Sequence, residues 1–238
     1  MGIIDLFFPR QVKCMFCKSE TGEFGICDKC LEILPMIVEP TCNKCGGRLI
    51  GDGSVCIECK GRKLDYDRCF CVLSYEEEIK QKIISFKQDG IKHIGETFAW
   101  LIERKFNELN LNVDMIIPVP INDNRLKERG FNQSEILAGE LVSTGKVNTN
   151  IIFRIIDTPH QTGLSRENRE INLKDCFKVK DKKSVKGKTI LLIDDIYTTG
   201  STLSECARTL RKAGATKVYA LCLARTPVES SRVLGNTK

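Results

Sequence analysis

Apolar residues recur at helical spacing in two segments that follow Tyr75. The apolar positions are Ile79, Ile83, Ile84 and Phe86 in residues 76–88, and Ile94, Phe98, Leu101, Ile102 and Phe106 in residues 92–107. Spacings of three and four residues place such side chains on one face of a helix. We therefore expect a helix over each segment.

Short apolar runs further along the chain predict β-strands at residues 113–119, 151–156, 190–193 and 217–224. Residues 190–193 are apolar without interruption, which is typical of a strand covered on both faces. Between the runs, Asn132 and Glu135 form a capping box for one helix, and residues 203–212 predict another that Gly214 ends. Because strands and helices alternate, we expect an α/β fold built on a parallel sheet flanked by helices.

The region before these elements is dominated by cysteine. Ten of the thirteen cysteines lie between positions 14 and 71, and eight of them form four C-x-x-C pairs: Cys14/Cys17, Cys27/Cys30, Cys42/Cys45 and Cys56/Cys59. Two such turns aim four sulfurs at one ion, so the pattern indicates two zinc sites. Disulfides are not expected, because the cytosol keeps thiols reduced.

The pairing of the four turns stays open at this point. The pairs are separated by nine, eleven and ten residues. Sequential pairing gives two compact zinc ribbons, whereas a cross-braced arrangement has the first and third pairs share an ion. Cys69 and Cys71 alternate with Phe70 and Val72, which predicts a strand. We interpret these two cysteines, and Cys176, Cys206 and Cys222, as small buried apolar residues.

Length, charge and hydropathy bear on the domain organisation, on nucleic-acid binding and on the location of the protein. A chain of 238 residues suits a medium domain with a small one, and we expect a zinc domain over residues 1–68 and an α/β domain over residues 69–238. The formal charge is +6, but two zinc ions held by eight thiolates would lower it to about +2, so charge is weak evidence for nucleic-acid binding. We find neither a bilayer-spanning run nor a signal peptide and expect a cytoplasmic protein.

The strand at residues 190–193 leads directly into candidate chemistry. Two adjacent acids, Asp194 and Asp195, suit a vicinal diol or a cation, and a loop running into a helix start favours a phosphate. There is no Walker sequence. The loop residues that we expect around the phosphate are Thr198, Thr199, Gly200, Ser201 and Thr202.

Two other segments carry cations. Arg125, Lys127 and Arg129 follow the strand at residues 113–119, and a turn with three cations suits a diphosphate and its Mg²⁺, although a solvated basic loop has the same composition. Residues 159–169 are polar and suit a loop that covers the site. The candidate catalytic residues are Asp194, Asp195, Arg166 and Arg169. We expect His160 to be a solvent-facing loop residue.

These motifs, in this order, resemble the ComF family of competence-associated proteins. The resemblance implies a double zinc ribbon joined to a type I phosphoribosyltransferase fold, in which Asp194 and Asp195 hold the ribose hydroxyls and residues 198–202 hold the 5-phosphate. It also implies zinc and Mg²⁺ as cofactors, phosphoribosyl diphosphate as ligand, a role in DNA uptake for transformation, and a helicase-like partner.

Two functions remain open from the sequence. One is a phosphoribosyltransferase, a pentosyl transferase that passes phosphoribose to a nucleobase or a related acceptor. The other is a non-catalytic factor that senses a phosphoribosyl ligand while its zinc ribbons contact single-stranded DNA or a protein, since this fold is reused by regulators.

Overall fold

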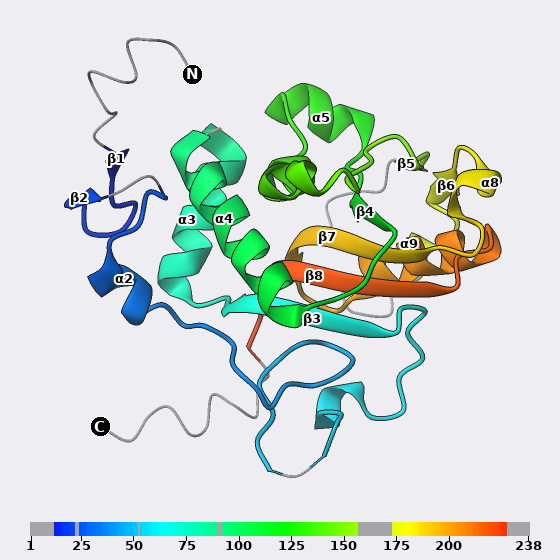
Figure 1. The fold of residues 1–238 in the computed structure, drawn as a ribbon, viewed down its shortest axis with the longest axis horizontal. Helices are drawn as coiled ribbons and strands as arrows, with labels where there is room; N and C mark the ends of the chain where they lie inside the picture. Colours follow the sequence, from blue (N-terminus) through cyan, green and yellow to red (C-terminus); the bar gives the residue numbers. More distant parts are fainter. Residues whose placement is uncertain (1–11, 22–23, 52, 90–91, 157–172, 228–238) are drawn as a thin grey trace.

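A parallel sheet forms the centre of the molecule (Figure 1). The computed structural model describes residues 12–21, 24–51, 53–89, 92–156 and 173–227. The four strands of the sheet lie in the order β3-β8-β7-β4, with bounds of Arg68–Ser74 for β3, Met115–Pro118 for β4, Thr189–Tyr197 for β7 and Lys217–Arg225 for β8. All three neighbouring pairs are parallel, as the alternation of strands and helices predicted.

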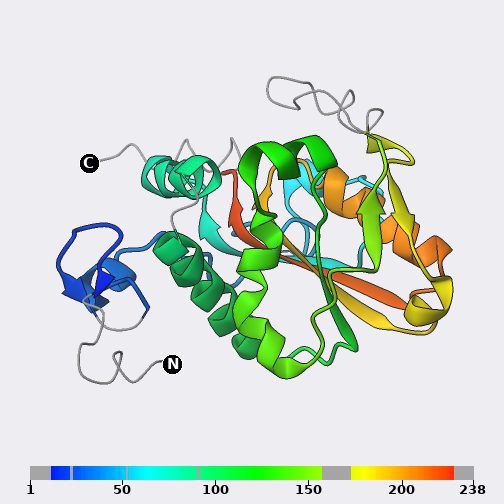
Figure 2. The same ribbon diagram turned by 90° about the horizontal axis from the view of Figure 1, so that it is seen from above.

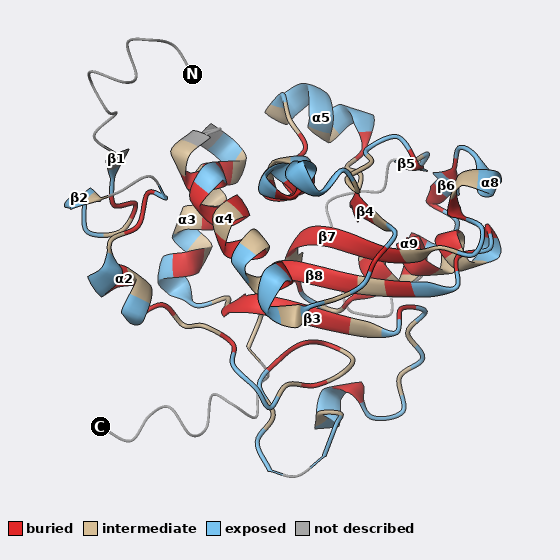
Figure 3. Ribbon diagram, in the orientation of Figure 1, coloured by how far each residue is buried: buried red, intermediate tan, exposed pale blue. Residues whose placement is uncertain are grey.

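The sheet separates two apolar cores, and both faces of β7 are buried (Figure 3). Ile190 and Leu192 belong to the core on one face, and Leu191 and Ile193 belong to the core on the other. Successive side chains of a strand point to opposite faces, so an uninterrupted apolar run is what a doubly covered strand requires. The prediction from residues 190–193 is confirmed.

Helices cover the two faces, with α4 and α9 on opposite sides of the sheet (Figure 2). Their bounds are Glu77–Asp89 for α3, Lys92–Leu109 for α4, Gln133–Leu137 for α6 and Ser201–Lys212 for α9, and a 3₁₀ helix, η2, spans Gly139–Thr144. The apolar faces of α3 and α4 meet through Phe86 and Phe98, whose rings lie edge to face with centroids 6.0 Å apart. All four predicted helices are present.

The predicted strand at residues 151–156 is not part of the main parallel sheet. It shortens to β5, Ile152–Arg154, and pairs antiparallel with β6, Phe177–Val179, in a separate two-stranded sheet that is followed by the short helix α8, Lys182–Val185. The pairing partner lies beyond a long polar segment, so the apolar run alone could not distinguish this small sheet from the main one.

The basic segment expected as a turn is a helix. Residues Asp123–Arg129 form α5, which begins after Asn122 and ends at Gly130. The Asn122 side chain accepts a hydrogen bond from the Arg125 backbone N–H at 2.8 Å, and Gly130 has a φ of +81°, a left-handed conformation that favours glycine. The cap and the stop therefore define a two-turn helix that carries the cations.

The two cysteine-rich units lie on opposite faces of the sheet. The first contains β1 (Val12–Lys13), β2 (Glu20–Thr21) and α2 (Asp28–Glu32), and it packs beside α4, where Phe24 stacks on Trp100 with centroids 4.8 Å apart. The second contains the 3₁₀ helix η1, Ile57–Cys59, and its cysteines join the core that includes α9. Among the described residues, no helix is long and apolar enough to cross a membrane.

Candidate metal sites and anion-binding pocket

The eight C-x-x-C cysteines gather into two groups of four. Cys14, Cys17, Cys27 and Cys30 form one group, and Cys42, Cys45, Cys56 and Cys59 form the other, with all sulfurs of a group within 4.8 Å of one another. The structure therefore has the sequential arrangement and not the cross-braced one. Sγ atoms lie 3.6 Å apart for Cys17 and Cys27 and 3.7 Å apart for Cys45 and Cys56. Four sulfurs at about 2.3 Å from a tetrahedral zinc ion would be spaced by about 3.8 Å, so both groups fit zinc.

Three further cysteines also meet. The sulfurs of Cys69, Cys71 and Cys222 lie within 4.8 Å of one another, because Cys71 and Cys222 are register partners on β3 and β8. All three are buried, as are Cys176 and Cys206. The prediction that these five residues are buried is confirmed, and only their grouping was not foreseen.

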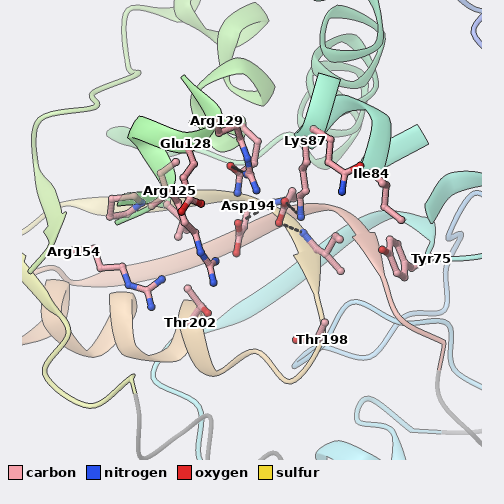
Figure 4. A pocket seen from close by; sticks show the side chains of 17 residues that line it. Tyr75, Ile84, Lys87, Arg125, Glu128, Arg129, Arg154, Asp194, Thr198 and Thr202 are labelled. Carbon is pink, nitrogen blue, oxygen red and sulfur yellow. Dashed lines mark hydrogen bonds and ion pairs between the residues drawn. The ribbon is translucent and has the colours of Figure 1, made fainter. Parts of the chain in front are cut away.

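A pocket of about 770 Å³ opens at the carboxyl ends of β4 and β7 (Figure 4). Ligands of open α/β sheets bind at this edge. Its polar and charged lining comes from the residue after β3, from α3, α5, α6 and β5, and from the segment that runs from β7 into α9. The lining consists of Tyr75, Lys87, Gln88, Arg125, Glu128, Arg129, Gln133, Arg154, Asp194, Asp195, Thr198 and Thr202. The pocket thus holds three acids, Glu128, Asp194 and Asp195, together with several cations.

The two acids have different environments. Asp194 Oδ1 accepts hydrogen bonds from Ser134 Oγ at 3.2 Å and from the Asp195 backbone N–H at 2.9 Å. Burial, and then the neighbouring charge of Asp195, raise the pKa of Asp194 to about 7. Burial would also raise the pKa of Asp195, but the ion pair with Lys87, the hydrogen bond from the Ile196 backbone N–H and the charge of Arg129 together lower that pKa. The pair therefore holds its charge mainly on Asp195.

The loop after β7 is shaped by its own hydroxyls and by one glycine. Gly200 has a φ of +76° and is the N-cap of α9. A Cβ at this position would lie 2.7 Å from Tyr197 Cζ, so only glycine fits. Thr199 Oγ1 and Ser201 Oγ are 2.8 Å apart and hydrogen-bonded. The first backbone N–H groups of α9 and the positive end of its dipole face this loop, as an anion requires.

Only some of the predicted binding residues line the pocket. Asp194, Asp195, Thr198, Thr202, Arg125 and Arg129 line the pocket together. Thr199, Gly200 and Ser201 form the same loop but do not line the pocket. The predicted catalytic residues Arg166 and Arg169, and His160, lie outside the described residues.

The most informative residue that the sequence did not identify is Lys87. It stands in the last turn of α3 and reaches Asp195, which lies far along the chain. Arg154 at the end of β5 also lines the pocket. A lysine near the end of an amphipathic helix is common on solvated faces, so nothing in the sequence singles it out. Arg129 is partly buried, and mainly this burial lowers its pKa.

Comparison with known proteins gives two family matches and a set of full-length relatives. Residues 3–60 match the double zinc ribbon domain, and residues 87–236 match the phosphoribosyl transferase domain. Since these matches end at residue 60 and begin at residue 87, the boundary predicted between residues 68 and 69 stays a prediction.

The relatives extend over nearly the whole chain. Competence protein F of Haemophilus influenzae is 30% identical over 225 residues, which cover 90% of this chain and 96% of that protein. DNA utilization protein YhgH of Escherichia coli is 29% identical over 223 residues, with coverages of 90% and 96%. Competence protein ComFC of Bacillus subtilis is 28% identical over 220 residues, with 84% of each chain covered.

Proposed function

Because the chain belongs to the ComF family, which joins a double zinc ribbon to a phosphoribosyltransferase domain, we propose that its pocket binds phosphoribosyl diphosphate with Mg²⁺. One observation carries the proposal. Two buried acids lie in the last part of β7, the hydroxyl-rich start of α9 follows the end of that strand, and cations line the same pocket. This spacing suits a ligand with a diol between two phosphate groups.

Each part of the ligand has a matching set of groups. Asp194 and Asp195 accept hydrogen bonds from the ribose 2- and 3-hydroxyls. The 5-phosphate lies at residues 198–202, where backbone N–H groups and hydroxyls donate to it. The diphosphate faces Arg125 and Arg129, whose guanidinium groups can each donate two parallel hydrogen bonds.

Lys87 gives this arrangement a ligand-dependent contact. Its ammonium group pairs with Asp195, which is the acid that carries the charge. A ribose hydroxyl that donates to Asp195 competes with Lys87, and the released ammonium then stands beside the diphosphate. The ion pair keeps the buried carboxylate satisfied until the ligand arrives.

The proposed reaction is displacement at the ribose C1 atom. A nucleobase nitrogen forms a bond to C1 while the C1–O bond breaks, the electron pair leaves with the diphosphate, and the proton of the nucleobase N–H passes to a diphosphate oxygen. The acids supply oxygen donors of the kind that Mg²⁺ prefers, and the ion would neutralise charge on the leaving group. Arg166 and Arg169 are proposed to cover the pocket and exclude water.

A second candidate function follows from the relatives. Their printed names concern competence and DNA utilization. The phosphoribosyl ligand would then act as a signal, and the ribbons would contact single-stranded DNA or a helicase-like protein during DNA uptake. Contacts with DNA phosphates make the affinity for single-stranded DNA fall as the salt concentration rises. An affinity that does not depend on salt concentration would therefore contradict DNA binding by the ribbons.

Calorimetric titration of phosphoribosyl diphosphate with Mg²⁺ tests the ligand. Wild type is compared with Asp194→Asn/Asp195→Asn and with the matched control Glu103→Gln/Glu108→Gln, which removes the same charge from α4 outside the pocket. Saturable binding by wild type and control, lost in the acid variant, supports the proposal. No binding by folded wild type refutes it. Release of diphosphate in the presence of nucleobases then separates the enzyme from the sensor.

A further inference from the structure

The second cysteine-rich unit, which we call ribbon 2 and define as residues 40–66, touches the phosphate loop, residues 198–202, and the residues on either side of it. Arg62 Nη2 donates to the Thr199 carbonyl oxygen at 2.5 Å. The Tyr66 and Tyr197 hydroxyls lie 2.9 Å apart in a buried hydrogen bond. These contacts join segments that are more than a hundred residues apart in sequence, with separations of 137 and 131 positions.

The contact at Thr199 acts on the part of the loop that sets its path. The Tyr197 hydroxyl also donates to the Thr199 carbonyl oxygen, at 3.5 Å. Tyr197 is only 1% exposed and lies directly beneath Gly200. The Thr199 carbonyl oxygen thus accepts from one donor on ribbon 2 and one at the end of β7, and these two hydrogen bonds fix the peptide group in the middle of the loop.

A third contact fixes the start of α9. The Asp65 backbone N–H donates to Ser204 Oγ at 3.1 Å, and Ser204 Oγ donates to Asp65 Oδ2 at 3.0 Å. Because Ser204 stands in the first turn of α9, ribbon 2 holds both the loop and the helix whose N-terminus points at it.

The contacts of ribbon 2 with the loop are made close to its own cysteine group. Arg62 follows the ligand Cys59 by three residues, and its backbone N–H donates to the Cys59 carbonyl oxygen at 3.2 Å. On the other side, Glu58 pairs with Arg225 at 3.2 Å, and the Arg225 guanidinium lies 5.8 Å from the centre of the Tyr197 ring. Both links start within the turn that contains Cys56 and Cys59.

We propose that Arg62 is a positioning residue through which ribbon 2 holds the phosphate loop in its binding conformation. The inference deepens the proposed function, because it names what sets the affinity of that same pocket. A loop ordered before the ligand arrives loses less conformational entropy on binding. Since zinc orders a ribbon that has little core of its own, occupancy at Cys42, Cys45, Cys56 and Cys59 is linked to ligand affinity.

The test compares Arg62→Gln with Arg48→Gln. The control makes the same change in the same ribbon at an exposed arginine. Calorimetry with phosphoribosyl diphosphate and Mg²⁺ should give an affinity on the order of 10-fold weaker for Arg62→Gln, the effect of one charge-assisted hydrogen bond, and wild-type affinity for the control. Arg62→Lys, which keeps one donor and the charge, should recover part of the loss.

Two further measurements exclude a general loss of structure. Zinc content should stay at about two per chain in Arg62→Gln, as in wild type. Amide hydrogen exchange at residues 199–202 should become faster in this variant without ligand, whereas exchange in β7 and β8 should not change. If Arg62→Gln fails to fold, Tyr66→Phe removes only the hydroxyl contact with Tyr197 and takes its place.

The outcomes separate this inference from the proposed function. Unchanged affinity and unchanged exchange in Arg62→Gln overturn the inference while the pocket assignment stands. Weaker affinity that appears only together with zinc loss overturns the role of Arg62, since loss of the ribbon's fold, and not of this one hydrogen bond, would then lower the affinity. If wild type with two zinc ions binds no phosphoribosyl diphosphate, the proposed function fails, and the link between ribbon and affinity is overturned with it.

Discussion

Replacing Asp194 with Asn should make the protein more stable at neutral and basic pH while it abolishes ligand binding. Asp194 is buried beside the charge of Asp195, and its pKa is raised from an ordinary value near 3.8 to about 7. A carboxyl group whose folded pKa lies above its unfolded pKa binds its proton more tightly in the native state. Its ionisation therefore opposes folding above that range, and stability falls as the pH rises from about 4 to about 7.

The size of the effect follows from the shift. At about 1.4 kcal/mol per pKa unit, a folded pKa of about 7 costs the native state about 4 kcal/mol at pH 8. At pH 5 the group is protonated in the folded state, and the cost falls to about 1.5 kcal/mol. Asn at this position can still accept from Ser134 Oγ and from the Asp195 N–H, the two donors to Asp194 Oδ1. Asp194→Asn should thus be stabilised by about 2–4 kcal/mol at pH 8 and clearly less at pH 5.

Urea unfolding at pH 5, 6.5 and 8 measures this difference directly. The unfolding free energy of wild type should decrease across the series relative to that of Asp194→Asn, and the gap between the two should widen by roughly 2–3 kcal/mol. A variant that is less stable than wild type at pH 8, or a gap that does not depend on pH, would show that Asp194 is not a buried and destabilising acid. Such a result would remove the reason for treating the acids as a strained binding pair.

Three other changes test separate parts of the structure. Lys87→Gln removes the ammonium group that is proposed to stand beside the diphosphate and should weaken binding of phosphoribosyl diphosphate by on the order of 10- to 100-fold in calorimetry, while Lys80→Gln on the exposed side of α3 should not. Gly200→Ala places a methyl group against Tyr197 at a φ of +76° and should lower the unfolding free energy in urea by at least about 1–2 kcal/mol. Metal analysis should find about two zinc ions per wild-type chain and about one in Cys27→Ser, because Cys27 belongs to the first sulfur group alone. A wild-type value near three would contradict this expectation and would indicate a metal at Cys69, Cys71 and Cys222.

Local chemistry made much of the molecule predictable. The cysteine spacing identified all eight members of the two sulfur groups, and the helical periods located α3 and α4. The uninterrupted run at residues 190–193 placed the central strand, although β7 continues through both acids to Tyr197. Each of these signals lies within a short stretch of sequence, so no knowledge of distant contacts was needed.

The features that escaped prediction depend on contacts between distant segments. Lys87 belongs to the pocket only because α3 ends beside β7, and β5 leaves the main sheet only because β6 pairs with it. Arg62 lies in the segment Lys60-Gly61-Arg62-Lys63, whose glycine and three basic residues are typical of a solvated turn. Its hydrogen bond to Thr199 exists because the sheet brings the ribbon and the loop to the same edge.

The position of the two ribbons explains why their roles should differ. The first packs beside α4 through Phe24 and Trp100, in the core that does not contain ribbon 2. The second joins the core beneath α9, and its Arg62 and Tyr66 contact the segment that begins the phosphate loop. Two sites with the same set of four cysteines therefore contact different parts of the domain. Because the residues around each site contact different parts of the domain, we expect the pocket to respond to metal at the second site and not to metal at the first.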